Sequence, residues 1–274
     1  MNVKDVNGIP PIGLGTWLRT GEDGYRAIRT AIDLGYRHLD TAQTYGTEEN
    51  VGRAVRDSGL PRAELFVVTK VTNANLRRHR FLPSVQESLD KMGLDKVDLT
   101  LIHWPSADEE VPLAEYMEGL AEAKAAGLTR LIGVSNFTVA HLDEAVAIIG
   151  EGEIATNQVE YHPFLQCPRL TAGCARHAIP ITAYMPLAKG RVSHDPTLIA
   201  IGIAHGILPS TVSLAWLLQK GMIVIPASSK PEHMKANLTA ASVRLSTDEM
   251  AAIDKLDRGE RIINPMGLAP AWDD

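Results

Sequence analysis

The sequence predicts an α/β protein of the (β/α)8, or TIM barrel, class, formed by residues 1–274 as a single domain. Strand-like apolar runs alternate with helix-like segments along the chain, which implies parallel strands joined by crossover helices. We count eight such runs, and eight strands favour closure into a barrel over an open sheet. The length of 274 residues also suits such a barrel, which typically needs about 250. Length alone would equally allow two smaller domains.

The strand-like runs are short, apolar and bounded by polar or glycine-rich segments. They lie at residues 12–16, 36–42, 65–71, 97–104, 129–135, 155–161, 179–185 and 222–228. Between them, apolar residues recur at helical spacing, as Leu82, Val85, Leu89 and Met92 do. Most of these helical segments then meet a glycine such as Gly93, which takes the left-handed conformation that closes a helix.

Three features fall outside this repeat. Gly206 and Pro209 divide the segment between the seventh and eighth runs, so we expect two helices there. Ser246 and Glu249 form a capping-box pattern, which predicts an extra helix after the barrel. The Pro/Gly-rich stretch 263–274 predicts a short irregular tail.

Composition excludes several classes of partner. The net charge of -6 provides no basic footprint for nucleic acid. No apolar run approaches the roughly 20 residues that span a membrane, and the first residues lack the pattern of a secretory signal. Cys167 and Cys174 match no metal or redox spacing, so we expect buried thiols and no metal site. Together these features predict a cytoplasmic protein.

Four reactive side chains lie at or just past the ends of strand-like runs. They are Asp40, Tyr45, Lys70 and His103. Strand C-termini of a parallel barrel converge on one mouth, where active sites form, and an acid, a phenol, an amine and an imidazole gathered there make a proton-transfer group. Each residue alone has a plainer interpretation as a cap, a packing aromatic, a solvated lysine or a core histidine. Their joint placement on three successive strands favours the active site.

This group suits the reduction of a carbonyl, which needs a hydride on carbon and a proton on oxygen. No ordinary side chain donates hydride, so a nicotinamide would supply it. Tyr45 could donate the proton, although free tyrosine has a pKa of about 10. A nearby Lys70 ammonium would favour the phenolate and make Tyr45 a better acid. Asp40 would hold Lys70 charged, and His103 could orient the carbonyl oxygen.

Six stretches of the chain resemble the aldo-keto reductases, in the order in which that family carries them. They are "GLGTW" (13–17), "LDTAQTYGTEENVG" (39–52), "TLIHWP" (100–105), "GVSNF" (133–137), "NQVEYHP" (157–163) and "IPASSK" (225–230). The likeness runs from about Ile12 to Asn237. Within the family, "LTLIHWPS", "TRLIGVSNFT" and the closing "GLAPAW" look most like the bacterial 2,5-diketo-D-gluconic acid reductases, particularly the B type.

The resemblance implies NADPH-dependent reduction of aldehydes or ketones, with Tyr45 as general acid, Asp40 and Lys70 as its support and His103 orienting the substrate. The implied cofactor residues are Thr16, with Ser135, Asn136 and Gln158 at the carboxamide, Tyr184 on the ring, Leu187, Lys189 and Gly190 at the pyrophosphate, and Ser228, Ser229, Lys230, His233 and Asn237 at the adenosine 2′-phosphate. The expected substrate contacts are Trp17, Tyr45, Thr72, His103 and Trp104. The resemblance also implies a monomer.

Two departures from the family pattern bear on specificity. In the phosphate region, Ala227 replaces a common lysine and His233 stands where an arginine is usual, while Lys230 supplies a positive charge nearby. Lysine binds phosphate as a point charge rather than through a bidentate fork, so we expect NADPH to be preferred over NADH, though less strictly. Thr72 occupies a position that is often aromatic, which predicts a more open and polar pocket. We therefore expect small polar dicarbonyls or keto-sugars, such as methylglyoxal or 2,5-diketo-D-gluconate, as substrates.

Two other functions fit part of this pattern. Lys70 could form a Schiff base in a lyase if its pKa were depressed, but the neighbouring Asp40 would keep it protonated. The chain could also be a nucleotide-sensing module without turnover. The presence of all four catalytic residue types disfavours that interpretation.

Overall fold

Eight parallel strands form one sheet, in their order along the chain, in the computed structural model, which describes residues 4–273. The strands are β1 (Gly13–Gly15), β2 (His38–Asp40), β3 (Phe66–Val71), β4 (Val97–Ile102), β5 (Thr129–Ser135), β6 (Ile154–Glu160), β7 (Ile181–Tyr184) and β8 (Ile223–Val224). Ile12 pairs in parallel with Val224 and so joins the last strand to the first. The predicted (β/α)8 barrel is therefore confirmed: seven strands lie inside their predicted runs, and β6 begins at Ile154, one residue before its run.

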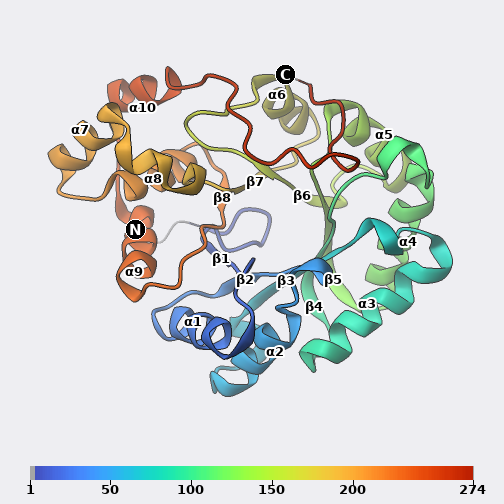
Figure 1. Cartoon of the computed structure of the whole chain (residues 1–274). Helices are drawn as coiled ribbons and strands as arrows, with labels where there is room; N and C mark the ends of the chain where they lie inside the picture. Colours follow the sequence, from blue (N-terminus) through green and yellow to red (C-terminus); the bar gives the residue numbers. More distant parts are fainter. Residues whose placement is uncertain (1–3, 274) are drawn as a thin grey trace.

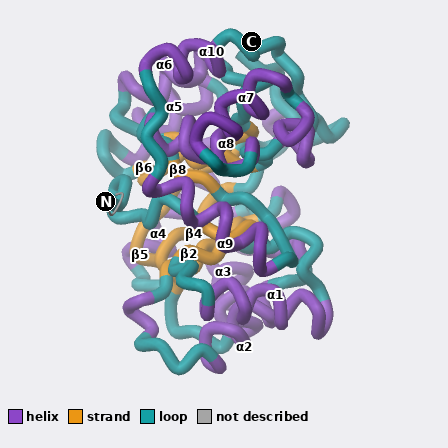
Figure 2. Tube along the Cα trace, turned by 90° about the vertical axis from the view of Figure 1, so that its left-hand side faces the viewer, coloured by secondary structure: helices purple, strands orange, loops and turns teal. Residues whose placement is uncertain are grey.

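Helices surround the barrel, as Figures 1 and 2 show. They are α1 (Gly21–Asp33), α2 (Glu48–Asp57), α3 (Arg78–Met92), α4 (Leu113–Ala125), α5 (Val139–Ile149), α6 (Pro168–Arg176), α7 (Pro196–His205), α8 (Pro209–Gln219), α9 (Pro231–Thr239) and α10 (Thr247–Asp254). The chain does divide at Gly206 into α7 and α8. The capping box of Ser246 and Glu249 starts α10, as the sequence predicts. No single helix among residues 4–273 is long and apolar enough to cross a membrane, and α7 with α8, which together pass that test, are bent by 89°.

The strand pattern decides which side chains reach the interior of the barrel. Every residue of β3 is buried, and alternate residues of a strand face the same side. Phe66 and Val68 pack in the smaller of two hydrophobic clusters, together with Leu99 and Leu101 of β4. Lys70 follows in the same alternation, one step closer to the C-terminal end of β3. A buried apolar layer therefore lies beneath the one lysine of this strand.

The segment after α10 is irregular, as predicted, and crosses the mouth of the barrel in front of β6 and β7 (Figure 1). The fully buried carboxylate of Glu160, at the end of β6, holds it there. This carboxylate accepts the backbone N–H groups of Ile262 at 2.8 Å and Ile263 at 2.7 Å. His162 Nε2 lies 2.9 Å from the same carboxylate. The tail is thus a fixed part of the mouth.

Candidate active site

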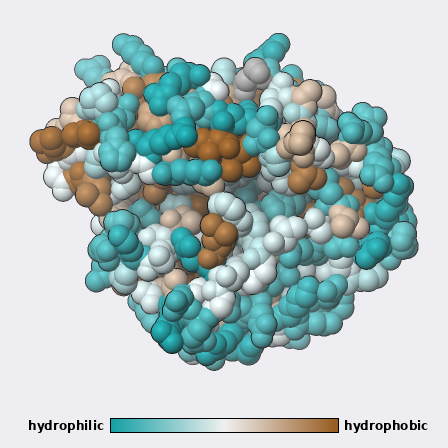
Figure 3. Space-filling model, in the orientation of Figure 1, coloured by the Kyte–Doolittle hydropathy of each residue, from teal (hydrophilic) through white to brown (hydrophobic). Residues whose placement is uncertain are grey.

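A cavity of about 820 Å³ opens at the C-terminal mouth of the barrel. Its walls come from the ends of β1, β2 and β4–β8, the loop after β7, the start of α8, α9 and the tail. Of the residues expected from the sequence, those that line it are Trp17, Asp40, Tyr45, His103, Trp104, Ser135, Asn136, Gln158, Tyr184, Leu187, Lys189, Gly190, Ser228, His233 and Asn237. Figure 3 shows this face of the molecule, hollowed near its centre and flanked there by hydrophobic side chains.

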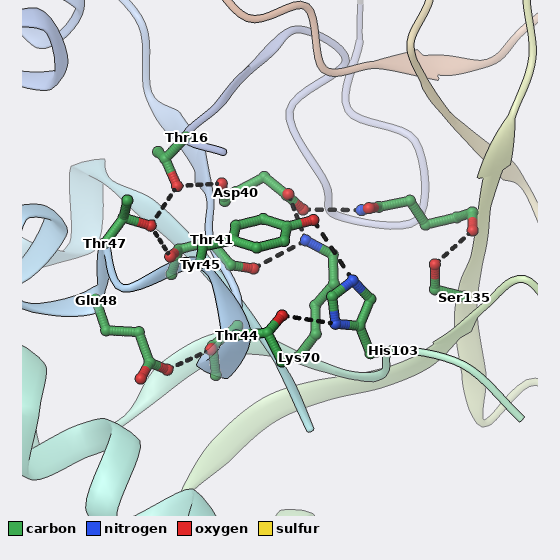
Figure 4. Close-up of polar contacts among 12 residues, drawn as sticks. Thr16, Asp40, Thr41, Thr44, Tyr45, Thr47, Glu48, Lys70, His103 and Ser135 are labelled. Atoms are coloured by element: carbon green, nitrogen blue, oxygen red, sulfur yellow. Dashed lines mark hydrogen bonds and ion pairs between the residues drawn. The ribbon is translucent and has the colours of Figure 1, made fainter. Parts of the chain in front are cut away.

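The four expected catalytic side chains point toward one another (Figure 4). Lys70 Nζ donates to Asp40 Oδ1 at 2.5 Å and to the backbone oxygen of Thr41 at 2.8 Å. It lies 4.9 Å from the centre of the Tyr45 ring. Tyr45 Oη is 3.5 Å from His103 Nε2. An acid–ammonium pair therefore backs a phenol, and the phenol and the imidazole face the cavity together.

Burial and neighbouring charges together set the protonation of the lysine and the phenol. Burial lowers the pKa of Lys70, but the charges and hydrogen bonds of Asp40 and Tyr45 outweigh it, so the net shift is upward. Lys70 is therefore an ammonium. Burial raises the pKa of Tyr45, and the Lys70 charge opposes that rise without cancelling it. The lowering effect expected of Lys70 is present, but the net direction in this structure is upward, so Tyr45 is a protonated phenol.

His103 is a neutral imidazole. Burial lowers its pKa to about 3, and the nearby Lys70 charge adds to the shift. A neutral imidazole has one N–H donor and one acceptor. Thr44 Oγ1 lies 3.5 Å from His103 Nδ1, so a hydroxyl is available on that side of the ring. Nε2, next to Tyr45 Oη, can then face an oxygen placed in the cavity.

The residues expected at a carboxamide form a connected network beside the catalytic group. Gln158 Nε2 donates to Asp40 Oδ2 at 2.8 Å. Asn136 Nδ2 donates to the backbone oxygen of His103 at 2.9 Å, and Tyr184 Oη donates to Asn136 Oδ1 at 2.8 Å. Ser135 Oγ donates to the backbone oxygen of Gln158 at 2.7 Å. The network fixes the amides in position and ties them to Asp40 and His103.

The far end of the cavity carries the expected phosphate region. Lys230 is the residue before the first turn of α9, and its backbone N–H donates to Ser228 Oγ at 3.1 Å. Ser229 and Lys230 are exposed beside the cavity rather than in its lining. Asn237 is 2% exposed and lines the cavity. Within residues 4–273 its Nδ2 makes no hydrogen bond of good geometry. Burial raises the pKa of the neighbouring Tyr36 to about 12, and the nearby Asn237 amide opposes that rise.

The expected substrate contacts divide into two groups. Trp17, which is 46% exposed, and the buried Trp104 border the cavity beside Tyr45 and His103. Thr72 does not belong to the lining, and its backbone N–H donates to Gln43 Oε1 at 3.0 Å. Its role as a pocket wall stays a prediction. Trp272 of the tail packs edge-on against Trp104, with 6.2 Å between ring centres, and reinforces that wall.

The tail and Glu160 contribute to the site without having followed from the sequence reasoning, whereas Thr16 was expected there and is absent from the cavity lining. The tail supplies Ile263 and Pro265 to the cavity lining, although nothing in its local pattern points to the barrel mouth. The hydroxyl of Thr16, which was expected at the cofactor, donates to the backbone oxygen of Asp40 at 2.9 Å. The sequence held one indication that Glu160 has a partner. It lies near the end of a strand-like run, and burying a carboxylate there is costly unless the carboxylate is paired.

Comparison with known proteins gives a consistent family. The aldo/keto reductase family profile matches residues 11–258. Methylglyoxal reductase DkgB of Escherichia coli O157:H7 is 45% identical over 97% of this chain and 99% of its own length. The crystal structure of a protein provisionally assigned as a 2,5-diketo-D-gluconic acid reductase B superposes with a TM-score of 0.92 at 42% identity, covering 98% of this chain and 96% of that one.

A third relative carries a cofactor. The crystal structure of the Bombyx mori aldo-keto reductase AKR2E4, in complex with NADP, superposes with a TM-score of 0.86 at 33% identity, covering 96% of this chain and 94% of that one. The family match covers most of the chain, and the barrel superposes on those of the relatives. This protein therefore belongs to the aldo/keto reductase family.

Proposed function

We propose that this enzyme catalyses the NADPH-dependent reduction of small polar dicarbonyls and keto-sugars, methylglyoxal and 2,5-diketo-D-gluconate among them. One observation carries the proposal: Tyr45 Oη and His103 Nε2 meet 3.5 Å apart at the cavity wall, with the Lys70 ammonium behind the phenol. This arrangement can hold a carbonyl oxygen between two donors and supply its proton from one of them. A carbonyl reduction needs both.

The cavity suits a dinucleotide. The nicotinamide of such a cofactor, when bound, supplies the hydride that the side chains cannot. Ser135, Asn136 and Gln158 offer the donors and acceptors that a carboxamide needs, and the Tyr184 ring can pack against a flat heterocycle. At the far end, the buried Nδ2 of Asn237 has no hydrogen bond of good geometry within residues 4–273 and can donate to an acceptor in the cavity. These features support assignment of the cofactor residues.

The proton-transfer step follows from the charges of the site. Tyr45 remains protonated because burial raises its pKa, so it holds a proton to give. As the carbonyl oxygen gains negative charge, Tyr45 Oη transfers its proton to that oxygen and becomes a phenolate. The Lys70 ammonium, held by Asp40 at 2.5 Å, stabilises the phenolate. Neutral His103 donates a hydrogen bond to the same oxygen and fixes its direction.

The choice of NADPH and of substrate rests on the chain's own residues and on its relatives. Lys230 places a positive charge at the start of α9, where backbone N–H groups and the helix dipole also favour an anion. A 2′-phosphate would benefit from this charge, and NADH lacks that group. The relatives named for methylglyoxal and for diketogluconate support small polar carbonyls.

The two alternative functions are less well supported. A Schiff-base lyase needs a lysine that is unprotonated and reachable, whereas Lys70 is fully buried and its pKa is raised. A nucleotide-sensing module would not need a protonated phenol and a neutral imidazole facing a shared cavity. A cytoplasmic location and a monomeric state remain predictions.

The test is steady-state oxidation of NADPH with methylglyoxal, keto-sugars and aromatic aldehydes. We expect turnover of the dicarbonyls and keto-sugars and a loss of about 10²-fold or more in kcat for Tyr45→Phe, because the ring remains and only the proton donor is removed. Binding of NADPH, followed by fluorescence, should be nearly unchanged in that variant. A Tyr45→Phe enzyme that kept more than about a tenth of the wild-type kcat would exclude Tyr45 as the general acid.

A further inference from the structure

Three buried threonine hydroxyls form a chain behind the Asp40–Lys70 pair (Figure 4). Thr41 Oγ1 lies 2.7 Å from Thr47 Oγ1. Thr47 Oγ1 lies 3.0 Å from Thr16 Oγ1, and Thr16 Oγ1 lies 2.9 Å from the backbone oxygen of Asp40. All three threonines are 0% exposed, so bulk water does not compete for these bonds.

The direction of the chain follows from counting protons. A hydroxyl has one proton to donate and two lone pairs to accept with. The Asp40 backbone oxygen can only accept, so Thr16 donates its single proton there. Thr16 must then accept from Thr47, and Thr47 must accept from Thr41. The relay therefore runs one way, from Thr41 through Thr47 and Thr16 to Asp40.

The Thr47 hydroxyl takes part in this relay instead of capping a helix. Thr47 is the residue before the first turn of α2, where a threonine hydroxyl normally accepts a backbone N–H of the helix. Its side chain makes no such capping bond. The hydroxyl is turned instead toward Thr16 and Thr41. The first turn of α2 therefore lacks a side-chain capping bond from Thr47, while the bonds from Thr47 to Thr16 and Thr41 are formed.

The relay holds the two groups that aim Lys70. The ammonium has three protons, of which one goes to Asp40 Oδ1 and one to the backbone oxygen of Thr41. The third is left for Tyr45, whose ring centre lies 4.9 Å from Nζ. Asp40 and Thr41 are consecutive at the end of β2, and both ends of the relay are anchored on them. A shift of this short segment would turn the third proton away from the phenol.

We propose that Thr47 is a positioning residue of the reductase site: its hydroxyl locks the end of β2 so that Lys70 faces Tyr45. The inference rests on the proposed function, because its consequence is read in the proton-transfer step. Thr47 touches neither the cavity nor the reacting atoms and acts through Asp40, Thr41 and Lys70.

The test is the variant Thr47→Val, which keeps the branched shape and removes the hydroxyl. We expect kcat to fall on the order of 10- to 100-fold, as displacement of a supporting group by a fraction of an ångström can produce. The KM for NADPH and for the carbonyl should stay near the wild-type values. The pKa that limits kcat at high pH should move upward, because Lys70 then stabilises the Tyr45 phenolate less. A purely structural role would not move this pKa.

Two variants control for packing. Thr47→Ser restores a hydroxyl and should recover most of kcat and the wild-type pH profile. Thr100→Val is the matched control, because the Thr100 hydroxyl is equally buried and has no hydrogen-bond partner within residues 4–273. We expect Thr100→Val to keep both kcat and the profile. A Thr47→Val enzyme with wild-type kcat and profile, or a Thr47→Ser enzyme no better than Thr47→Val, would overturn the proposal.

If Thr47→Val fails to fold, Thr41→Val provides the measurement. It removes only the first donor of the relay, so we expect a smaller, few-fold fall in kcat with the same upward movement of the profile; an unmoved profile would reject the relay. A wild-type enzyme that reduces none of the tested carbonyls would count against the proposed function instead. The relay would then be tested by ultraviolet titration of Tyr45, with the Tyr45→Phe protein subtracted as the reference. The relay requires the pKa of the Tyr45 phenol to be higher in Thr47→Val than in the wild type.

Discussion

The buried pair of Asp40 and Lys70 makes the stability of this barrel sensitive to one isosteric change, Asp40→Asn. Both side chains are at most 2% exposed, and Lys70 Nζ donates to Asp40 Oδ1 at 2.5 Å. The variant leaves an ammonium buried without its counter-charge. Breaking a buried pair in this way costs about 3–5 kcal/mol of unfolding free energy. At about 2–4 °C per kcal/mol for a domain of this size, the melting temperature should fall by roughly 6–20 °C.

The pH dependence gives this prediction a sign. In the wild type the folded-state pKa of Lys70 is raised. The contribution of Lys70 to the unfolding free energy is therefore fully present below its pKa in the unfolded chain and is lost as the pH rises through its pKa in the folded protein. In Asp40→Asn, burial acts without the carboxylate and lowers the pKa below its usual value. The unfolded chain then binds more protons, so the variant's stability rises with pH in that interval. The difference in unfolding free energy between the wild type and Asp40→Asn is therefore largest near neutral pH and becomes smaller toward alkaline pH.

Urea denaturation followed by circular dichroism at several pH values measures this gap. The double variant Asp40→Asn/Lys70→Met completes the cycle, because Met removes the charge while keeping a long side chain. We expect the double variant to be more stable than Asp40→Asn alone, by an interaction free energy on the order of 1–3 kcal/mol. An Asp40→Asn protein whose unfolding free energy lies within about 1 kcal/mol of the wild-type value at neutral pH, with a difference that does not change with pH, would refute the buried charge pair.

Three further predictions concern the cofactor, the substrate and the imidazole. Lys230→Ala should raise the KM for NADPH roughly ten-fold or more and leave that for NADH unchanged, since a charge-assisted bond contributes about 1.5–3 kcal/mol; equal effects on both cofactors would argue against contact with the 2′-phosphate. Glu160→Gln should raise the KM for the carbonyl several-fold and leave the KM for NADPH unchanged. The amide has one oxygen where the carboxylate has two, so it cannot hold the backbone N–H groups of Ile262 and Ile263 as the carboxylate does, and the tail that lines the cavity is loosened. An unchanged KM for the carbonyl would show that the tail keeps its place without the carboxylate. Because the pKa of His103 is about 3, kcat should show no step near the usual histidine pKa, and a step there that disappears in His103→Gln would contradict the neutral imidazole.

The sequence predicted those parts of the protein that depend on local pattern. Seven strands lie within the predicted apolar runs, and β6 starts one residue before its run. β1, β2 and β8 span only two or three residues. The catalytic quartet was found because each member stands at or just past a strand end, and strand ends converge. Helix α10 followed from its capping box.

What the sequence could not predict depends on contacts between distant segments or on burial. Glu160 meets Ile262 and Ile263 more than 100 positions away, and the path of the tail decides that contact. The pKa of Tyr45 rises rather than falls because desolvation outweighs the Lys70 charge, and desolvation depends on the packed environment. Thr72 illustrates the same limit, since its distance from the cavity depends on how the loop after β3 turns.

The closure between β8 and β1 has a consequence for how the barrel opens. It depends on few bonds: Val224 N–H donates to the backbone oxygen of Pro11 at 2.9 Å, and Gly15 N–H donates to that of Pro226 at 3.1 Å. Gly15 and Pro226 both border the cavity, on opposite sides of this seam. A dinucleotide in the cavity would span the seam and bind only the closed barrel, so it would suppress local opening there by mass action. We therefore expect amide hydrogen exchange at Gly15 and Val224 to become slower when NADPH is added.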